Sequence, residues 1–175
     1  PARAGRERML KYKTLAVAFL YPDDKLFSLF PAERSPAESG INSVPKNIGN
    51  VRPESEKLQA EYDRLFRASE IWLYTIEYLA ENEFQRADYL ADIMGFYRAF
   101  GMDSNKDRPD ALSNVLEFMY YLIFKEQRTQ VKENALICLD AQKKFFAQYV
   151  YLPTKKIAEI IIAQTQNDFY KEMAE

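Results

Sequence analysis

Carboxylates are the side chains whose type and spacing in this sequence could do chemistry. Asp88 and Asp92 are four residues apart and would share one helical face, where two carboxylates could hold a cation or act as an acid–base pair. Glu61 and Asp63 flank Tyr62 and, being two residues apart, would not share a face. Because helix charges at such spacings are usually solvated, we interpret both pairs as surface charges.

Glu117 differs from these pairs because it lies inside the strongly apolar stretch 116–121. A carboxylate among so many large side chains either occupies the polar face of its helix or is partly buried and paired. An arginine or a tyrosine hydroxyl would serve as the partner in the second case. The sequence leaves both alternatives open.

The chain contains no histidine and a single cysteine, Cys138. Imidazole bases, Ser-His or Cys-His nucleophile pairs and histidine metal ligands are therefore excluded. Cys138 lies in the apolar run 135–139, which predicts a buried, inert thiol, and one free cysteine fits a reducing compartment. The sequence also has no Gly-rich phosphate loop, so we expect no cofactor and no metal.

The overall charge argues against nucleic acid as a partner, because the net charge is −2 and the isoelectric point is near 5.5. An apolar run at 15–20 follows a basic N-terminal stretch. It is too short to span a bilayer, and Tyr21-Pro22-Asp23-Asp24 follows it in place of a small-residue cleavage pattern. We expect no stable membrane insertion.

The elements that must position these residues are predicted to be helices. A chain of 175 residues with five glycines fits one all-α globular domain, 1–175, of about six or seven helices. Apolar stripes at helical spacing place helices at 8–20, 25–30, from 53 onward, 84–100, after Asp107, 131–150 and 154–172. The Pro-, Gly- and Ser-rich segment 31–53 is predicted to be a mobile loop, and 71–78 an ordered loop or irregular helical turn.

Three positions are predicted to set helix ends. Gly101 suits the residue just past the helix 84–100. Asp107 can cap the next helix, with Pro109 and Asp110 in its first turn. Pro153 is expected to break the helix 131–150.

The middle of the chain is rich in aromatic side chains. Core packing is the default interpretation, and an apolar groove that receives a helix or an extended peptide is the alternative. The residues concerned are Trp72, Tyr74, Tyr78, Phe84, Tyr89, Phe96 and Tyr97.

Several blocks, in order along 8–165, resemble the TorD/DmsD/NarJ family of cytoplasmic chaperones for molybdenum enzymes. The run 62–66, YDRLF, is similar to the family's Y-x-x-L-F helix. The runs 108–112, RPDAL, and 115–119, VLEFM, are similar to its signature E-R-P-D-H-L-x-x-x-L-E-F-M. Further blocks at 90–93, 95–101 and 139–146 resemble the branch that serves ethylbenzene-dehydrogenase-like and related type II dimethyl-sulfoxide-reductase-family enzymes.

The resemblance implies a TorD-like helical chaperone that performs no covalent chemistry. It would bind the catalytic subunit of a molybdopterin oxidoreductase, through its twin-arginine leader or its apo-form, until cofactor insertion is complete. The resemblance also implies a cytoplasmic protein that is a monomer or a domain-swapped dimer. Because a leader offers arginines and then an apolar stretch, carboxylates beside an aromatic groove would suit it. The candidate client-binding residues are Trp72, Tyr74, Glu77, Tyr97, Asp110, Glu117 and Phe118.

The sequence departs from the family pattern at two places. Ala111 stands where the family has histidine, and the run 73–78, LYTIEY, lacks the proline of the family's P-Y-E-(S/T)-x-Y loop. Both departures bear on client specificity. Two other functions stay open: a non-catalytic assembly subunit of a redox complex, and an enzyme that uses carboxylates.

Overall fold

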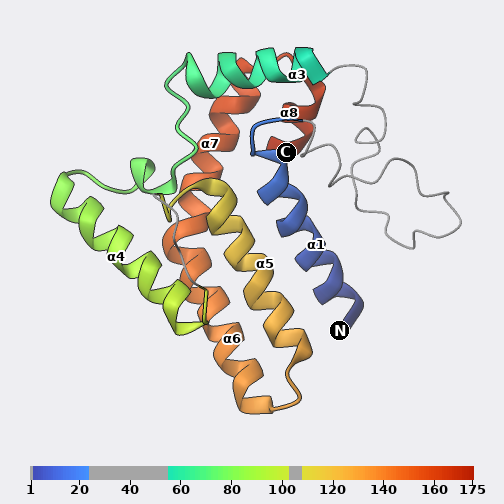
Figure 1. Cartoon of the computed structure of the whole chain (residues 1–175), viewed down its shortest axis with the longest axis vertical. Helices are drawn as coiled ribbons and strands as arrows, with labels where there is room; N and C mark the ends of the chain where they lie inside the picture. The colour runs from blue at the N-terminus through green and yellow to red at the C-terminus, as the bar shows by residue number, and fades with distance from the viewer. Residues whose placement is uncertain (1, 24–54, 103–107) are drawn as a thin grey trace, which may run out of the picture.

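The computed structural model describes residues 2–23, 55–102 and 108–175, and this part of the chain is almost entirely helical (Figure 1). The all-α prediction is confirmed: the described residues form no strand, and Tyr74 and Ala111 make an isolated antiparallel bridge. The predicted helix 25–30, the predicted loop 31–53 and the proposed cap Asp107 lie outside the described residues.

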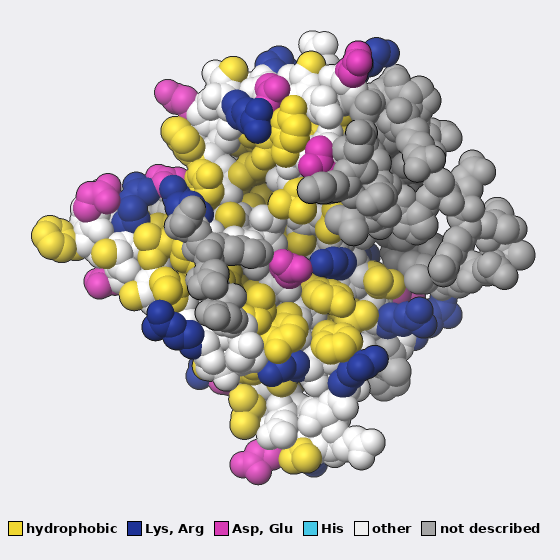
Figure 2. Space-filling view, in the orientation of Figure 1, with side chains coloured by type: hydrophobic (Ala, Val, Ile, Leu, Met, Phe, Trp, Pro, Cys, Tyr) yellow, Lys and Arg dark blue, Asp and Glu magenta, His cyan; other side chains and the backbone are white. Residues whose placement is uncertain are grey.

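Helix α5 (Leu112–Arg128) is the centre of the fold and packs against α1 (Ala2–Ala18) on one side and α6 (Lys132–Phe145) on another. Its sequence supplies seven buried apolar side chains at helical spacing, and that stripe anchors one contiguous core. Away from this stripe, α5 also carries aromatic side chains that make cation–π contacts: Lys125 lies over the Tyr121 ring and Arg128 over the Phe124 ring. Figure 2 shows hydrophobic and basic side chains gathered over the middle of this face.

Helix α6 and helix α7 (Tyr151–Gln164) join through a π-helical turn, η5 (Phe146–Val150), into one rod (Figure 1). The prediction that Pro153 ends a helix is therefore wrong. A proline inside an α-helix clashes with the carbonyl four residues earlier and removes a hydrogen bond. The wider π turn directly before Pro153 relieves this conflict, and the Thr154 hydroxyl donates to the Val150 carbonyl at 2.7 Å.

The last predicted helix, 154–172, is divided in the structure. Helix α7 ends at Gln164, and α8 spans Asp168–Ala174. Asn167 caps α8, because its side-chain oxygen accepts from the backbone N–H groups of Phe169 at 3.0 Å and Tyr170 at 3.3 Å. The polar run Thr165-Gln166-Asn167 is the sequence signal for this break. The prediction missed it because the apolar residues on both sides fit one continuous helix.

Helix α4 (Glu83–Ala99) projects from the bundle and carries clear signals at both ends (Figure 1). Asn82 caps its start by accepting from the Gln85 N–H at 3.0 Å. Gly101 has φ +75° just past its end, and the Met102 N–H donates to the Tyr97 carbonyl at 2.9 Å. The predicted role of Gly101 is confirmed, and the geometry is a Schellman motif.

Helix α3 (Ser55–Tyr62) continues into a π turn, η3 (Asp63–Arg67), across one end of the rod (Figure 1). Glu61 accepts from Arg64 and from the Thr165 hydroxyl at 2.7 Å, which ties α3 to the turn between α7 and α8. These hydrogen bonds, led by the one from Arg64, hold the pKa of Glu61 below its ordinary value. Glu61 is therefore a structural residue rather than a solvated charge.

Asp88 and Asp92 are exposed on α4, as expected, and Asp92 also accepts from the Tyr149 hydroxyl. Cys138 is buried, and burial raises the pKa of its thiol, as expected for an inert cysteine. Among the described residues, no cluster of three or more cysteines and carboxylates could hold a metal ion. None of the described helices is both long enough and apolar enough to cross a bilayer.

Candidate functional site

Two segments that are far apart in the sequence meet just before α5. Thr75 donates its N–H to the Asp110 carbonyl at 2.9 Å, and Leu112 donates its N–H to the Leu73 carbonyl at 2.9 Å. Between these bonds lies the bridge of Tyr74 and Ala111. The expected irregular turn at 71–78 is thus held by backbone pairing and ends in the short 3₁₀ helix η4 (Thr75–Tyr78).

This pairing also changes where α5 begins. Pro109 and Asp110 were predicted to lie in its first turn, and this is wrong, since the helix begins at Leu112. The Ala111 backbone is extended, with ψ 134°, because it pairs with Tyr74. Pairing across the fold therefore overrides the local helix-start signal.

Arg108 connects the side chains of the two segments. Its Nε and Nη2 donate to the two carboxylate oxygens of Asp110 at 3.0 and 3.1 Å, and Nη2 also donates to Glu77 Oε1 at 3.2 Å. The Asp110 side chain has no exposed surface, whereas that of Arg108 is 39% exposed. The guanidinium lies 3.7 Å from the centre of the Tyr74 ring. We call Arg108, Asp110, Glu77 and Tyr74 the Arg108 brace.

Glu77 is shared by two arginines, because Arg86 of α4 donates to the same carboxylate oxygen as Arg108. The Arg86 hydrogen bond, followed by that of Arg108, holds the pKa of Glu77 below its ordinary value against the opposing effect of burial. Arg86 also lies 3.4 Å from Glu83, at the start of α4. The charged cluster therefore joins η4, the first turns of α4 and the segment just before α5.

Tyr97 of α4 holds the backbone of the brace between Arg108 and Asp110. It is 2% exposed and donates its hydroxyl to the Pro109 carbonyl at 2.8 Å, which joins α4 to the segment before α5. Burial raises the pKa of this hydroxyl far above its ordinary value, so it is a permanent donor. Phe118 is fully buried against the rings of Tyr97 and Phe145, with centroids 4.8 and 4.7 Å away.

Trp72 is the predicted site residue that faces solvent most fully, with 52% of its surface exposed. Its position is fixed at the backbone, because the Tyr78 hydroxyl donates to the Trp72 carbonyl at 3.0 Å. A large aromatic side chain held out by an ordered loop is suited to contact another molecule.

Glu117 lies elsewhere, on the side of α5 that faces α1. Its carboxylate accepts from Lys13 Nζ at 3.1 Å, and its side chain is 37% exposed. Glu117 is therefore partly buried and paired, as in the second alternative, and Lys13 is a partner that the sequence analysis did not name.

Through Arg108 the structure brings together three of the seven predicted residues, Tyr74, Glu77 and Asp110. Tyr97 contacts the neighbouring Pro109 carbonyl, and Trp72 lies two residues before Tyr74 in the same loop. The structure places Phe118 behind them in the core and Glu117 apart. Sequence reasoning missed the central role of Arg108 and the contribution of Arg86. The Arg-Pro-Asp run was a usable signal for the first, since proline restricts the backbone between the two charges.

The part of the chain that the structure describes is an all-helical fold, in which the Arg108 brace joins two loops that are distant in the sequence. Residues 41–153 match the nitrate reductase delta subunit family, and this stretch is more than half of the chain. The protein therefore belongs to that family, which consists of maturation chaperones for molybdoenzymes and includes the NarJ and TorD types. No curated protein and no solved structure matches the chain.

Proposed function

We propose that this protein is a system-specific chaperone that binds the immature catalytic subunit of a molybdopterin oxidoreductase in the cytoplasm, before export or assembly. The observation that carries the proposal is that the family signature is built into the Arg108 brace, and that Trp72, two residues before Tyr74 of the brace, is half exposed. Family membership supplies the class of client, and the brace supplies the surface that would contact it.

The predicted site residues take different parts in this proposal. Trp72 contacts the client directly, because it alone among them combines a large apolar surface with high exposure. Asp110 and Tyr97 are buried and act by positioning, since they fix Arg108 and the segment before α5. Binding energy comes from covering apolar surface, while the brace keeps the loop ordered before the client arrives.

A twin-arginine leader that binds at Glu77 would have to compete with arginines of the chain itself. Glu77 already pairs with two arginines, so a leader arginine would reach it by displacing Arg86 or Arg108. A leader arginine would offer a planar, forked guanidinium that can hold both oxygens of a carboxylate, whereas the single ammonium group of a lysine would not. Recognition of the leader through Glu77 therefore depends on arginine rather than on positive charge alone.

The test is a calorimetric titration of the full chain with synthetic leader peptides from the molybdoenzymes of its host, and separately with an apo catalytic subunit. Each leader is paired with a control in which both arginines are replaced by lysine. Trp72 is the single tryptophan of the chain, so its emission reports directly whether the client covers it. Saturable binding with a negative heat-capacity change and a shift of Trp72 emission is expected.

A matched pair of variants tests the surface itself. Trp72→Ala is expected to weaken binding about tenfold or more, as a buried aromatic anchor does. Phe84→Ala is the control, because Phe84 is 86% exposed on the neighbouring helix and lies outside the brace. Binding of the apo-subunit alone would identify the form recognised. A chain that binds neither leader nor apo-subunit would refute the proposal.

A further inference from the structure

The turn between α5 and α6 forms one end of the molecule, and the first half of α1 lies beside the helix that leads to it (Figure 1). Arg8 of α1 contacts Glu126 of α5 at 3.3 Å close to this turn. The basic start of α1 and the last turns of α5 are therefore neighbours. We call residues 2–13 and 117–137 together the hairpin end.

The hairpin end is basic, although the chain as a whole is slightly acidic. The whole chain has 24 lysines and arginines against 26 acidic residues, whereas the hairpin end has eight against four glutamates. Three of these glutamates already pair with a basic residue of the same end. Arg6, Arg128 and Lys132 are exposed and make no ion pair with any residue that the structure describes. The surplus charge that faces solvent here is therefore positive.

The same end exposes large aliphatic side chains. Val131, Leu136 and Ile137, around the first turns of α6, are 54, 56 and 54% exposed. Lys132 follows Val131 directly, and Arg128 precedes it by three residues, so cations flank these apolar groups. Exposed aliphatic groups gathered among unpaired cations are typical of a surface that another body covers.

Aromatic rings extend this surface along α5. Tyr120 and Phe124 are four residues apart, partly exposed and stacked, with ring centroids 6.2 Å apart. Lys13 Nζ lies 5.4 Å from the centre of the Tyr120 ring, and the Arg128 guanidinium lies 4.7 Å from that of Phe124. Figure 2 shows hydrophobic and basic side chains together on this face. Aromatic, aliphatic and basic side chains in one surface are the composition of proteins that lie at a bilayer interface.

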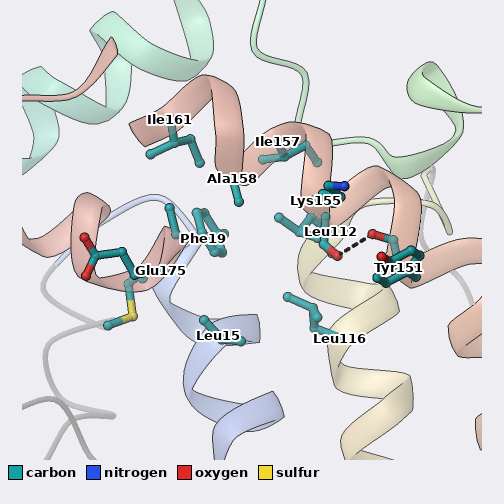
Figure 3. A pocket seen from close by; sticks show the side chains of 13 residues that line it. Leu15, Phe19, Leu112, Leu116, Tyr151, Lys155, Ile157, Ala158, Ile161 and Glu175 are labelled. Carbon is teal, nitrogen blue, oxygen red and sulfur yellow. Dashed lines mark hydrogen bonds between the residues drawn. The ribbon is translucent and has the colours of Figure 1, made fainter. Parts of the chain in front are cut away.

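The other end of α1 offers no comparable surface among the described residues. Leu15 and Phe19 line a hollow of about 290 Å³ that α8 closes with Met173 and Glu175 (Figure 3). The apolar side chains there are enclosed, and the carboxylate of Glu175 would repel an anionic surface. Exposed apolar groups and surplus positive charge therefore coincide at the hairpin end.

We propose that the hairpin end docks on the surface of a bilayer that contains anionic lipid. Arg6, Arg128 and Lys132 lie among the phosphate headgroups, while Leu136 and Ile137 enter the boundary between headgroups and acyl chains. A nucleic acid backbone would satisfy the cations but leave the aliphatic side chains uncovered. Cations spread over two helices and the turn between them suit a broad, fluid layer. This inference goes beyond the chaperone proposal and needs no client.

The test is co-sedimentation of the full chain with lipid vesicles. One set is phosphatidylcholine alone, and in the other about a third of the lipid is anionic phosphatidylglycerol. We expect at least about tenfold tighter binding to the anionic vesicles, with the preference fading as salt rises. Failure to bind the anionic vesicles, or equal binding to both sets, would overturn the proposal.

Charge-reversed variants locate the contact. Arg6→Glu combined with Lys132→Glu should abolish the preference for anionic vesicles. The fold should survive, because both side chains are exposed and the dipole of α6 favours a carboxylate at its first residue. Lys155→Glu combined with Lys171→Glu makes the same change in net charge on exposed sites of α7 and α8. This control should bind as the wild type does, and an equal loss in both double variants would contradict docking through the hairpin end.

A second pair of variants tests whether apolar side chains enter the bilayer. Leu136→Gln combined with Ile137→Gln should weaken binding to anionic vesicles about tenfold, because aliphatic surface no longer leaves water. Leu152→Gln combined with Ile162→Gln is the control, since these side chains are 41 and 42% exposed on α7. Unfolding in urea verifies that all variants are folded. If the first pair binds the vesicles as tightly as the wild type, the proposed insertion is wrong.

Soluble poly-glutamate distinguishes a lipid surface from an acidic protein. If it binds the chain as tightly as anionic vesicles do, and Leu136→Gln with Ile137→Gln does not weaken that binding, the end docks an acidic protein and the lipid proposal fails. Trp72→Ala should bind vesicles like the wild type, because Trp72 lies outside the hairpin end. Loss of vesicle binding in the hairpin variants with retained client binding therefore separates this proposal from the chaperone proposal.

Discussion

Removing Arg108 or Asp110 from the Arg108 brace should lower the stability of the fold by different amounts. Asp110→Ala removes a carboxylate and leaves the guanidinium with 39% of its side chain exposed and with Glu77 at 3.2 Å. Arg108→Ala instead leaves the Asp110 carboxylate with no exposed surface and no guanidinium. A buried charge that loses its partner is penalised far more than an exposed one.

The magnitudes follow from this difference in burial. Asp110→Ala loses two charge-assisted hydrogen bonds but leaves a charge that water and Glu77 can solvate, so a loss of about 2 kcal/mol is expected. Arg108→Ala is expected to lose about 4 kcal/mol, within the range for an orphaned buried ion, and to lower Tm by about 10 °C. In the double variant no buried charge is left alone, so it should be more stable than Arg108→Ala.

The assay is urea unfolding of the wild-type chain, the two single variants and the double variant, followed by circular dichroism. The double-mutant cycle then gives the coupling free energy between the two side chains. Two results would refute the reasoning: additive losses, or Arg108→Ala no less stable than Asp110→Ala. Either would mean that the carboxylate is not held by Arg108 in solution.

The glycines and Glu77 supply two further predictions. Gly101→Ala should destabilise the chain by about 1 kcal/mol, because φ is +75° at this position. Gly95→Ala, inside α4 with open space where the Cβ would lie, should stabilise the chain by about 0.5–1 kcal/mol. Thermal unfolding of both variants checks the opposite signs, and equal shifts in Tm would contradict the helix end described here. The pKa of Glu77 is held below its ordinary 4.5, so its contribution to stability is complete above that pH and is lost as the pH falls through the lower folded value. Between about pH 5 and 3 the wild-type chain should therefore lose stability more steeply than Glu77→Gln, and parallel profiles would show that the pairing with Arg86 and Arg108 is absent.

The spacing of apolar residues predicted most of the helices, because each helix buries one stripe of apolar side chains. The apolar spacing in 84–100 and the glycine after it located α4 and its end, since both signals arise within one element. The same reasoning failed before α5. Pro109 and Asp110 look like a helix start, but backbone pairing with the loop at 73–75 holds this segment extended, and no local pattern reveals such a partner.

The candidate site shows a similar division. Trp72 and Asp110 could be selected from composition and from the family signature, but their different roles depend on burial. Arg108 stands in the same signature and was not selected. Its importance comes from simultaneous contact with Asp110, 2 residues away, and with Glu77, 31 residues away. Long-range pairing of this kind is fixed by packing rather than by spacing.

The π turn in the rod also limits how the chain can change in length. One residue advances an α-helix by about 100°, so deleting a single residue from 146–150 would turn the whole of α7 by that angle relative to α6. Ile157 and Ile161 would leave the core, and Pro153 would meet a regular turn. When related chains are aligned, the core-facing positions of α6 and of α7 must therefore be assigned separately. A one-residue gap at this turn would mark a rotation of one helix relative to the other.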